Sequence, residues 1–242
     1  MPTVTDKFLA NPVKFMASHL VMVQLGSLNP GPTPVRLELD TTKTCRTKIG
    51  KLAGKGKIPV CRLVPCNATT DMFSIYWLPY QNNKVYHMQL GHTARYLFTP
   101  TMDGCSFSVG GQDPVGAPLV AHANMQTDDG QIDQVEIGVQ LDAVYGGDAY
   151  GVMKKDRYTS SKHFNVGSGH VRATTFGVSD GAAWGFWAQV WEDCHKGMAK
   201  KSALTNMDPN SPGYGSNAYF NQLTAAGSSF ELLGVKSLKR RG

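Results

Sequence analysis

Short runs in which apolar and polar residues alternate recur along most of this chain. In "VRLELD", the apolar residues Val35, Leu37 and Leu39 alternate with charged ones. A two-residue period of this kind is typical of a strand with one buried face. The pattern therefore predicts a protein built mainly from strands. Other runs rich in β-forming residues occupy 71–80, 84–91, 95–100, 105–111, 118–125 and 135–145.

Helical patterns are fewer. Residues 13–25, "VKFMASHLVMVQL", carry apolar residues at helical spacing and stop at a glycine, which predicts a helix. The Asp180-Gly181 pair lies between two β-rich runs and predicts a hairpin over 170–192. The stretch 146–169 is rich in glycine and serine and predicts mostly loop.

The predicted elements show no regular alternation of strand and helix, which argues against a doubly wound parallel sheet. The expected fold class is α+β: a β-sandwich of mixed or antiparallel sheets surrounded by helices and long loops. The chain has 242 residues and contains no internal repeat or low-complexity linker. We therefore expect one domain over 1–242, present as a monomer.

The net charge of +6 is concentrated in two basic runs. The run 43–57, "KTCRTKIGKLAGKGK", contains no acidic residue, and the chain ends in "KSLKRRG". Basic runs bind nucleic acid, membranes or acidic proteins, but a solvated loop and a frayed tail are the simpler explanation. The lack of aromatic residues within 43–57 argues against single-stranded nucleic acid. We expect neither nucleic acid nor a membrane as partner, and steering toward an acidic protein stays open.

The five cysteines are irregularly spaced and odd in number, which makes a poor disulfide framework. Cys61 and Cys66 lack a second pair that could complete a zinc site, so we expect no metal and no other cofactor. This cysteine usage indicates a reducing working environment. The first 26 residues lack the pattern of a classical signal peptide, so export of the protein would need another route.

The strongest candidate chemistry lies in "MDGCSFSVGG" and in "PLVAHANM" further along. Cys105 follows a tight Asp103-Gly104 pair at the start of a predicted strand, and His122 occupies an alternating position in the next strand. Strands separated by one loop are often neighbours in a sheet. A histidine within hydrogen-bond reach activates a thiol, and backbone amides near Gly104 would form an oxyanion hole. The alternative is a buried structural thiol, because free cysteine packs like a small hydrophobe.

Four features recur in a fixed order through this region: the pairs Leu78-Pro79, Phe98-Thr99 and Gly104-Cys105, and the spacing Pro118-x-x-x-His122. In this order they resemble the catalytic core of the Burkholderia lethal factor type of toxin. That family belongs with the cytotoxic necrotizing factor-like proteins, which are protein glutamine deamidases with a Cys-His pair on a β-sandwich. The chain differs from the family in having Asp103 where a serine is frequent, and in a longer interval between cysteine and histidine.

The resemblance implies that Cys105 is the nucleophile and His122 the base, with Thr99 and Gly104 holding the substrate amide or the oxyanion. It implies a single catalytic deamidase domain over 1–242 that converts a glutamine of a host protein to glutamate. The target would be a DEAD-box translation-initiation helicase, whose modification blocks translation, or a Rho-type GTPase. The protein would be a toxin secreted without a classical signal peptide and active in the host cytosol.

Two alternatives stay open. A cysteine protease or a transglutaminase uses the same thioester chemistry. A basic β-sandwich binding module with a structural Cys105 would catalyse nothing. Reaction of Cys105 with thiol reagents separates the enzymes from the module.

Overall fold

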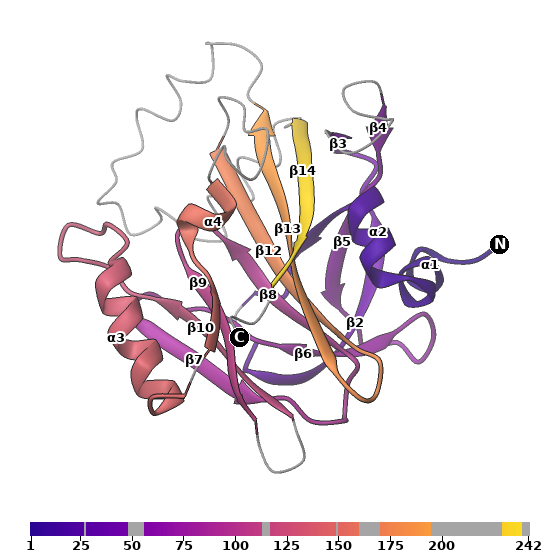
Figure 1. Cartoon of the computed structure of the whole chain (residues 1–242). Helices are drawn as coiled ribbons and strands as arrows, with labels where there is room; N and C mark the ends of the chain where they lie inside the picture. The colour runs from indigo at the N-terminus through magenta and orange to yellow at the C-terminus, as the bar shows by residue number, and fades with distance from the viewer. Residues whose placement is uncertain are drawn as a thin grey trace.

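Two β-sheets lie against each other at the centre of the computed structural model, and helices cover their outer sides (Figure 1). The structure describes residues 1–26, 28–47, 56–112, 117–148, 150–159, 170–194 and 229–238. These residues form fourteen strands and four helices, which confirms the prediction of a strand-rich α+β fold. Among them, no helix is long and apolar enough to span a membrane.

The larger sheet has ten strands. In order across the sheet they are β1 (Leu20–Val23), β5 (Val60–Pro65), β2 (Gly31–Leu39), β6 (Phe73–Trp77), β8 (Tyr96–Met102), β12 (His170–Ser179), β13 (Trp184–Cys194), β14 (Ser229–Ser237), β3 (Thr44–Thr47) and β4 (Lys57–Ile58). The sheet is mixed: β1 and β5, β6 and β8, and β14 and β3 run parallel, and its other pairs run antiparallel.

The smaller sheet has four strands and is antiparallel throughout. Its order is β11 (Tyr150–Met153), β9 (Ser106–Gln112), β10 (Pro118–Asn124) and β7 (Lys84–Gln89). The four helices are α1 (Val4–Ala10), α2 (Pro12–Ser18), α3 (Gln134–Tyr145) and α4 (Lys155–Thr159).

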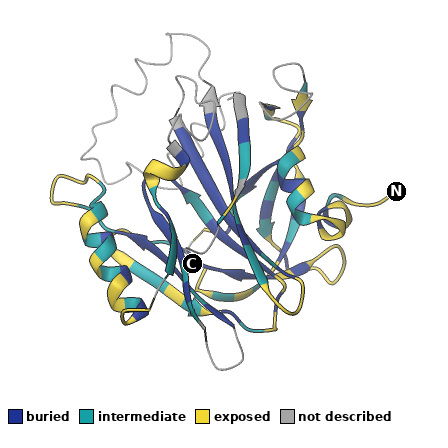
Figure 2. Ribbon diagram, viewed as in Figure 1, coloured by how far each residue is buried: buried dark blue, intermediate teal, exposed yellow. Residues whose placement is uncertain are grey.

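Three apolar clusters set the order of the layers. Between the sheets, Phe107 and Val120 of the smaller sheet belong to one buried cluster with Leu97 and Phe186 of the larger. On the far face of the larger sheet, α1 and α2 bury Phe8, Phe15 and Met16 against Trp77, Phe98 and Phe176. On the far face of the smaller sheet, α3 buries Ile137, Leu141 and Tyr145 against Ala121 and Ala123. The result is a β-sandwich with α1 and α2 on one outer side and α3 on the other (Figures 1 and 2).

The predicted hairpin over 170–192 is confirmed by β12 and β13, which pair in register from His170 and Asp193 to Ser179 and Trp184. Asp180 Oδ1 accepts hydrogen bonds from the amides of Ala182 and Ala183 at 2.9 and 2.8 Å. An aspartate at this position commonly closes a turn by bonding to its own backbone.

The predicted helix over 13–25 is wrong beyond Ser18. The Ser18 hydroxyl bonds back to the carbonyls of Lys14 and Phe15, and His19 is extended, which ends α2. The next four residues, "LVMV", form β1, which pairs in parallel with β5. A run that is apolar at every position suits a strand buried on both faces, and here it overrides the helical spacing.

The predicted strand over 135–145 is also wrong, because these residues belong to α3. Asp133 caps the helix by accepting from the amides of Val135 and Glu136. Ile137 and Leu141 are four residues apart and lie on the buried helical face, whereas Val135 and Val139 are exposed. The alternating apolar residues therefore divide between two sides of a helix.

The predicted loop over 146–169 contains β11 and α4; residues 149 and 160–169 lie outside the described part of the chain. The basic run 43–57 lies partly outside it as well, at 48–55. Within the described part of that run, Lys43 forms an ion pair with Asp40 at 2.7 Å. Lys43 therefore has an acidic partner within the chain.

Candidate active site

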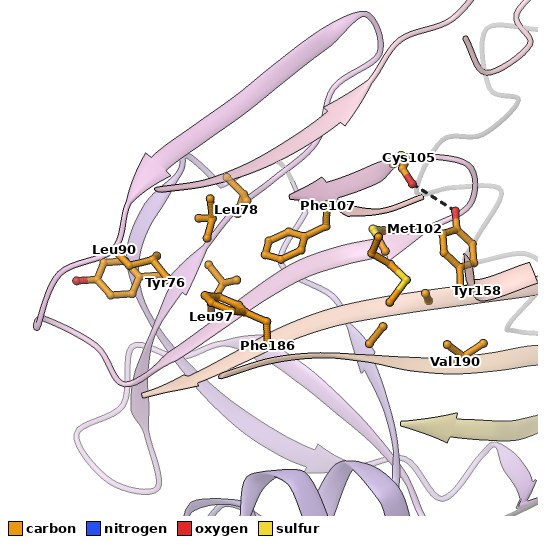
Figure 3. Close-up of a cluster of buried hydrophobic side chains, with 14 of the residues drawn as sticks. Tyr76, Leu78, Leu90, Leu97, Met102, Cys105, Phe107, Tyr158, Phe186 and Val190 are labelled. Carbon is orange, nitrogen blue, oxygen red and sulfur yellow. Dashed lines mark hydrogen bonds between the residues drawn. The ribbon is translucent and has the colours of Figure 1, made fainter. Parts of the chain in front are cut away.

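Cys105 lies between a tight turn and β9, as the sequence predicts. Gly104 in this turn has φ +122°, and a Cβ atom there would lie 2.5 Å from Cγ1 of Ile132, so the turn requires glycine. Cys105 is 5% exposed and belongs to the cluster between the sheets, at the end where Met102 lies (Figure 3). The thiol is therefore an interior group.

Tyr158 of α4 fixes the backbone around the thiol. Its hydroxyl accepts a hydrogen bond from the amide of Gly104 at 2.6 Å. It donates another to the carbonyl of Cys105 at 3.4 Å (Figure 3). Gln134 donates to the carbonyl of Gly104 at 3.1 Å. The Gly104 amide, predicted from the sequence as an oxyanion donor, is thus bonded to Tyr158.

His122 lies in β10 directly opposite Phe107 of β9. Successive side chains of a strand point to opposite faces, so His122 shares the inner face of the smaller sheet with Val120 and Phe107. Cys105 stands two residues before Phe107 and belongs to the same inner cluster. Diagonal neighbours on paired strands lie roughly 7–8 Å apart, within reach of long side chains. The fold therefore brings Cys105 and His122 to neighbouring positions on one face.

The segment that follows β6 surrounds the histidine. The carbonyls of Leu78 and Pro79 approach its ring and favour the protonated form. The ring of Tyr80 lies 5.9 Å from that of His122, centroid to centroid. Tyr80 is half-buried, and a charge on Cys105 contributes to raising the pKa of its hydroxyl, after the larger effect of burial. The ring of Tyr80 is therefore a neighbour of the His122 ring.

Burial sets the resting charge of the pair. It raises the pKa of the Cys105 thiol to about 12, although the amides of Asp103 and Cys105 favour the thiolate. It lowers the pKa of His122 to about 4. Neither ring nitrogen has a hydrogen bond of good geometry to a described residue. At neutral pH the pair is a thiol and a neutral imidazole, so the imidazole is in the form that accepts a proton.

Thr99 is fully buried and stabilises the junction of β8 and β12. Its hydroxyl accepts from the amide of Thr175 at 3.2 Å and lies 3.0 Å from the carbonyl of Pro100, to which it donates. The pairing of the two strands shifts register between Thr174 and Phe176, where the Thr99 side chain replaces a backbone partner. Its described contacts are with the backbone of the larger sheet.

The sequence analysis did not identify three residues of this region: Tyr80, Tyr158 and Asn124. Tyr158 is 53 positions from Cys105, and no local pattern links them. Asn124 follows His122 by two residues in the strand, and this spacing was a usable indication that the two side chains share a face.

Comparison with known protein families and with curated proteins found no match to this chain. The described residues contain no group of three or more histidine, cysteine, aspartate or glutamate side chains arranged to hold a metal ion.

We predict that Tyr158→Phe lowers the stability of the protein by roughly 1–3 kcal/mol, because it leaves the buried amide of Gly104 without an acceptor. The measurement is the free energy of unfolding in urea. Tyr86→Phe is the matched control, since the Tyr86 hydroxyl bonds to the exposed Gln81. Equal losses in the two variants would show that the Tyr158 hydroxyl does not hold the turn.

Thr99→Val should likewise lower stability by roughly 1–3 kcal/mol, because the amide of Thr175 loses its acceptor while the side-chain volume is kept. Thr101→Val is the control, since the hydroxyl of Thr101 forms a longer contact, 3.5 Å, with the hydroxyl of Thr174. Thermal unfolding followed by circular dichroism compares the two. An unchanged midpoint for Thr99→Val would contradict a role in holding the strands together.

Proposed function

We propose that this protein is a cysteine-dependent protein glutamine deamidase, with Cys105 as nucleophile and His122 as general base. The observation that carries the proposal is the placement of these side chains on one inner face of paired strands, directly after a turn that requires glycine. A nucleophile and a base on rigid neighbouring strands are held in a defined relation. The resemblance of the surrounding motifs to the necrotizing-factor type of deamidase points to the same chemistry.

The reaction starts when His122 takes the thiol proton and Cys105 Sγ attacks the side-chain amide carbon of a glutamine. Protonated His122 then gives its proton to the leaving nitrogen, the C–N bond breaks, and ammonia departs from the thioester. Water, deprotonated by His122, attacks the thioester, the C–S bond breaks, and Cys105 recovers a proton. Glutamine becomes glutamate.

The amide of Cys105 is the better candidate to stabilise the oxyanion, because the amide of Gly104 already bonds to Tyr158. One donor of this kind contributes roughly 3 kcal/mol to the transition state. The resting pair is neutral, and proton transfer from Cys105 to His122 forms the reactive thiolate.

The resemblance makes a DEAD-box translation-initiation helicase the first candidate target and a Rho-type GTPase the second. The protein would act in the host cytosol after secretion without a classical signal peptide, and the basic run 43–57 is a candidate for steering toward an acidic target. A single new carboxylate in a functional cleft of the target is enough to disable it, and one catalyst modifies many targets.

A second candidate is a non-enzymatic β-sandwich module, and the burial of both groups favours it. His122 is fully buried and Cys105 nearly so. Core packing is the commonest role of such residues. In that case Cys105 would fill space beside Met102 and Phe107 and react with nothing.

The test is to treat a host-cell lysate with the wild-type protein and with Cys105→Ala, and to compare the peptides by mass spectrometry. A deamidase produces glutamine-to-glutamate conversions that depend on Cys105. New chain termini would indicate a protease, and incorporation of an added primary amine would indicate a transglutaminase. Identical peptide sets for both proteins would favour the binding module.

A further inference from the structure

Asn124 is a buried polar residue whose hydrogen bonding is incomplete. It is the last residue of β10 and is 3% exposed. Its Nδ2 donates to Oδ1 of Asn82 at 3.0 Å, whereas its own Oδ1 has no partner among the described residues. A buried acceptor without a donor costs roughly 1–3 kcal/mol of stability. Such a group needs an explanation, and a ligand that brings the missing donor is one.

The position of Asn124 connects it to the candidate catalytic pair. It follows His122 by two residues in β10, so both side chains occupy the inner face of the smaller sheet. The pairing of β10 with β9 runs through Ala123 and Ser106. Continued by one residue, the same register sets Asn124 opposite Cys105. Side chains in directly opposed positions have Cβ atoms roughly 4.5–5.5 Å apart.

Asn82 determines which end of the Asn124 amide remains for a ligand. Asn82 is exposed, and its Oδ1 accepts from the Nδ2 of Asn124. The Nδ2 of Asn124 is therefore already paired. The group that remains for a ligand is Oδ1, which only accepts hydrogen bonds.

Resting on the proposed deamidase function, we propose that Asn124 is a specificity residue that accepts a hydrogen bond from the NH₂ group of the substrate carboxamide. A primary amide donates two N–H bonds, whereas a carboxylate or an ester donates none. The Asn124 oxygen therefore favours glutamine over the glutamate product and over esters. A site whose buried polar group pairs with the substrate rejects analogues that leave this group unpaired.

The alternative is that Asn124 only positions His122. A positioning residue affects every reaction of Cys105 equally, because it acts on the base and not on the reagent. A specificity residue affects only reagents that carry an N–H donor. The two roles are therefore separated by a ratio of rates.

The experiment measures alkylation of Cys105 in the folded protein by iodoacetamide, which carries a primary amide, and by methyl iodoacetate, which does not. Peptide mapping by mass spectrometry isolates Cys105 from the other cysteines, and rates with free N-acetylcysteine correct for intrinsic reactivity. We expect the corrected preference of the wild type for iodoacetamide to fall roughly three- to tenfold in Asn124→Leu, the effect of one hydrogen bond. Asn124→Asp keeps an acceptor and should retain the preference, even where its charge slows both reagents.

Ser106→Ala is the matched control. Ser106 is also buried, and its hydroxyl lacks a partner among the described residues, but it stands opposite Ala123, whose side chain packs toward α3. This variant should keep the wild-type ratio. Asn124→Ala, with the fold checked by circular dichroism, replaces Asn124→Leu if the leucine does not fit.

Each outcome has a distinct meaning. An unchanged ratio in the Asn124 variants, with Cys105 still reactive, would overturn the specificity role and leave the nucleophile in place. Equal slowing of both reagents without a change of ratio would also overturn it, in favour of positioning. No alkylation of Cys105 by either reagent in the folded wild type would overturn the proposed function itself, and this inference with it.

Discussion

Cys105→Ser should reduce glutamine deamidation by at least on the order of 10³-fold, because a hydroxyl is a much weaker nucleophile than a thiol in a site built around one neutral imidazole. The substitution is nearly isosteric. We expect a loss of stability of only about 1 kcal/mol, the effect of placing a hydroxyl among apolar neighbours such as Met102 and Phe107. Ammonia release and urea unfolding measure the two effects on the same samples.

Cys61→Ser provides a close control for this prediction. Cys61 is also buried, and burial likewise raises the pKa of its thiol to about 12, but it belongs to the cluster beneath α1 and α2. Its replacement should lower stability to a similar extent and leave deamidation unchanged. Equal activities of the two serine variants would remove Cys105 from the mechanism, and equal inactivity would trace the loss to unfolding.

The elements that could be predicted from the sequence are those whose local pattern and tertiary environment agree. The hairpin of β12 and β13 has a turn pair, Asp180-Gly181, between two β-rich runs, and both indications lead to the same structure. β9 and β10 are alternating runs close together in the sequence, and they pair as neighbours in the sheet. His122 lies in β10 and Cys105 directly precedes β9, so the sequence could predict that the two candidates belong to neighbouring segments of the sheet.

The two wrong elements are those whose apolar spacing fits more than one structure. "VEIGVQLDAVY" satisfies the two-residue period of a strand and also places Ile137, Leu141 and Tyr145 four residues apart, as a helix requires. The helix is stabilised over the strand by the capping bond of Asp133 and by burial of its apolar face against Ala121 and Ala123. In 13–25, the second half forms a strand because it pairs with β5. In both segments the secondary structure depends on residues that are distant in the sequence.

The surroundings of the candidate site could not be predicted for the same reason. The bond between Tyr158 and Gly104 joins α4 to the turn before β9, and the position of α4 depends on how it packs on the larger sheet. The same holds for the contact of Tyr80 with His122, which joins the end of β6 to β10. The residue types in the sequence indicated Cys105 and His122 as candidates. The side chains around them become known only from the packing of the two sheets.

The second large effect is expected for His122→Phe, which should reduce deamidation on the order of 10²–10⁴-fold, the usual contribution of a general acid–base group. Phenylalanine is apolar and of similar size, and it suits a site beside Tyr80 and Phe107. It also removes two buried nitrogens that lack hydrogen-bond partners among the described residues. At pH 7 the variant should therefore be at least as stable as the wild type while it is inactive. His87→Gln, at an exposed position of β7, is the control and should keep full activity.

The same variant tests the burial of His122 through the pH dependence of stability. The pKa of His122 is lowered from 6.5 to about 4 in the folded protein, chiefly because burial disfavours the charged ring. Between these values the unfolded chain binds a proton that the folded protein does not, so stability falls as the pH drops from 6.5 toward 4. This loss amounts to about 3 kcal/mol at the acid end of the range, and it occurs only in the wild type, because the variant has no histidine at this position.

Urea unfolding from pH 7 to pH 4 measures this effect. The free energy of unfolding of His122→Phe should rise relative to that of the wild type by about 3 kcal/mol, since the other titrating groups are common to both. A difference that stays constant across this range would mean that His122 remains in contact with water, and a difference that shrinks would mean that an acidic group stabilises its protonated form.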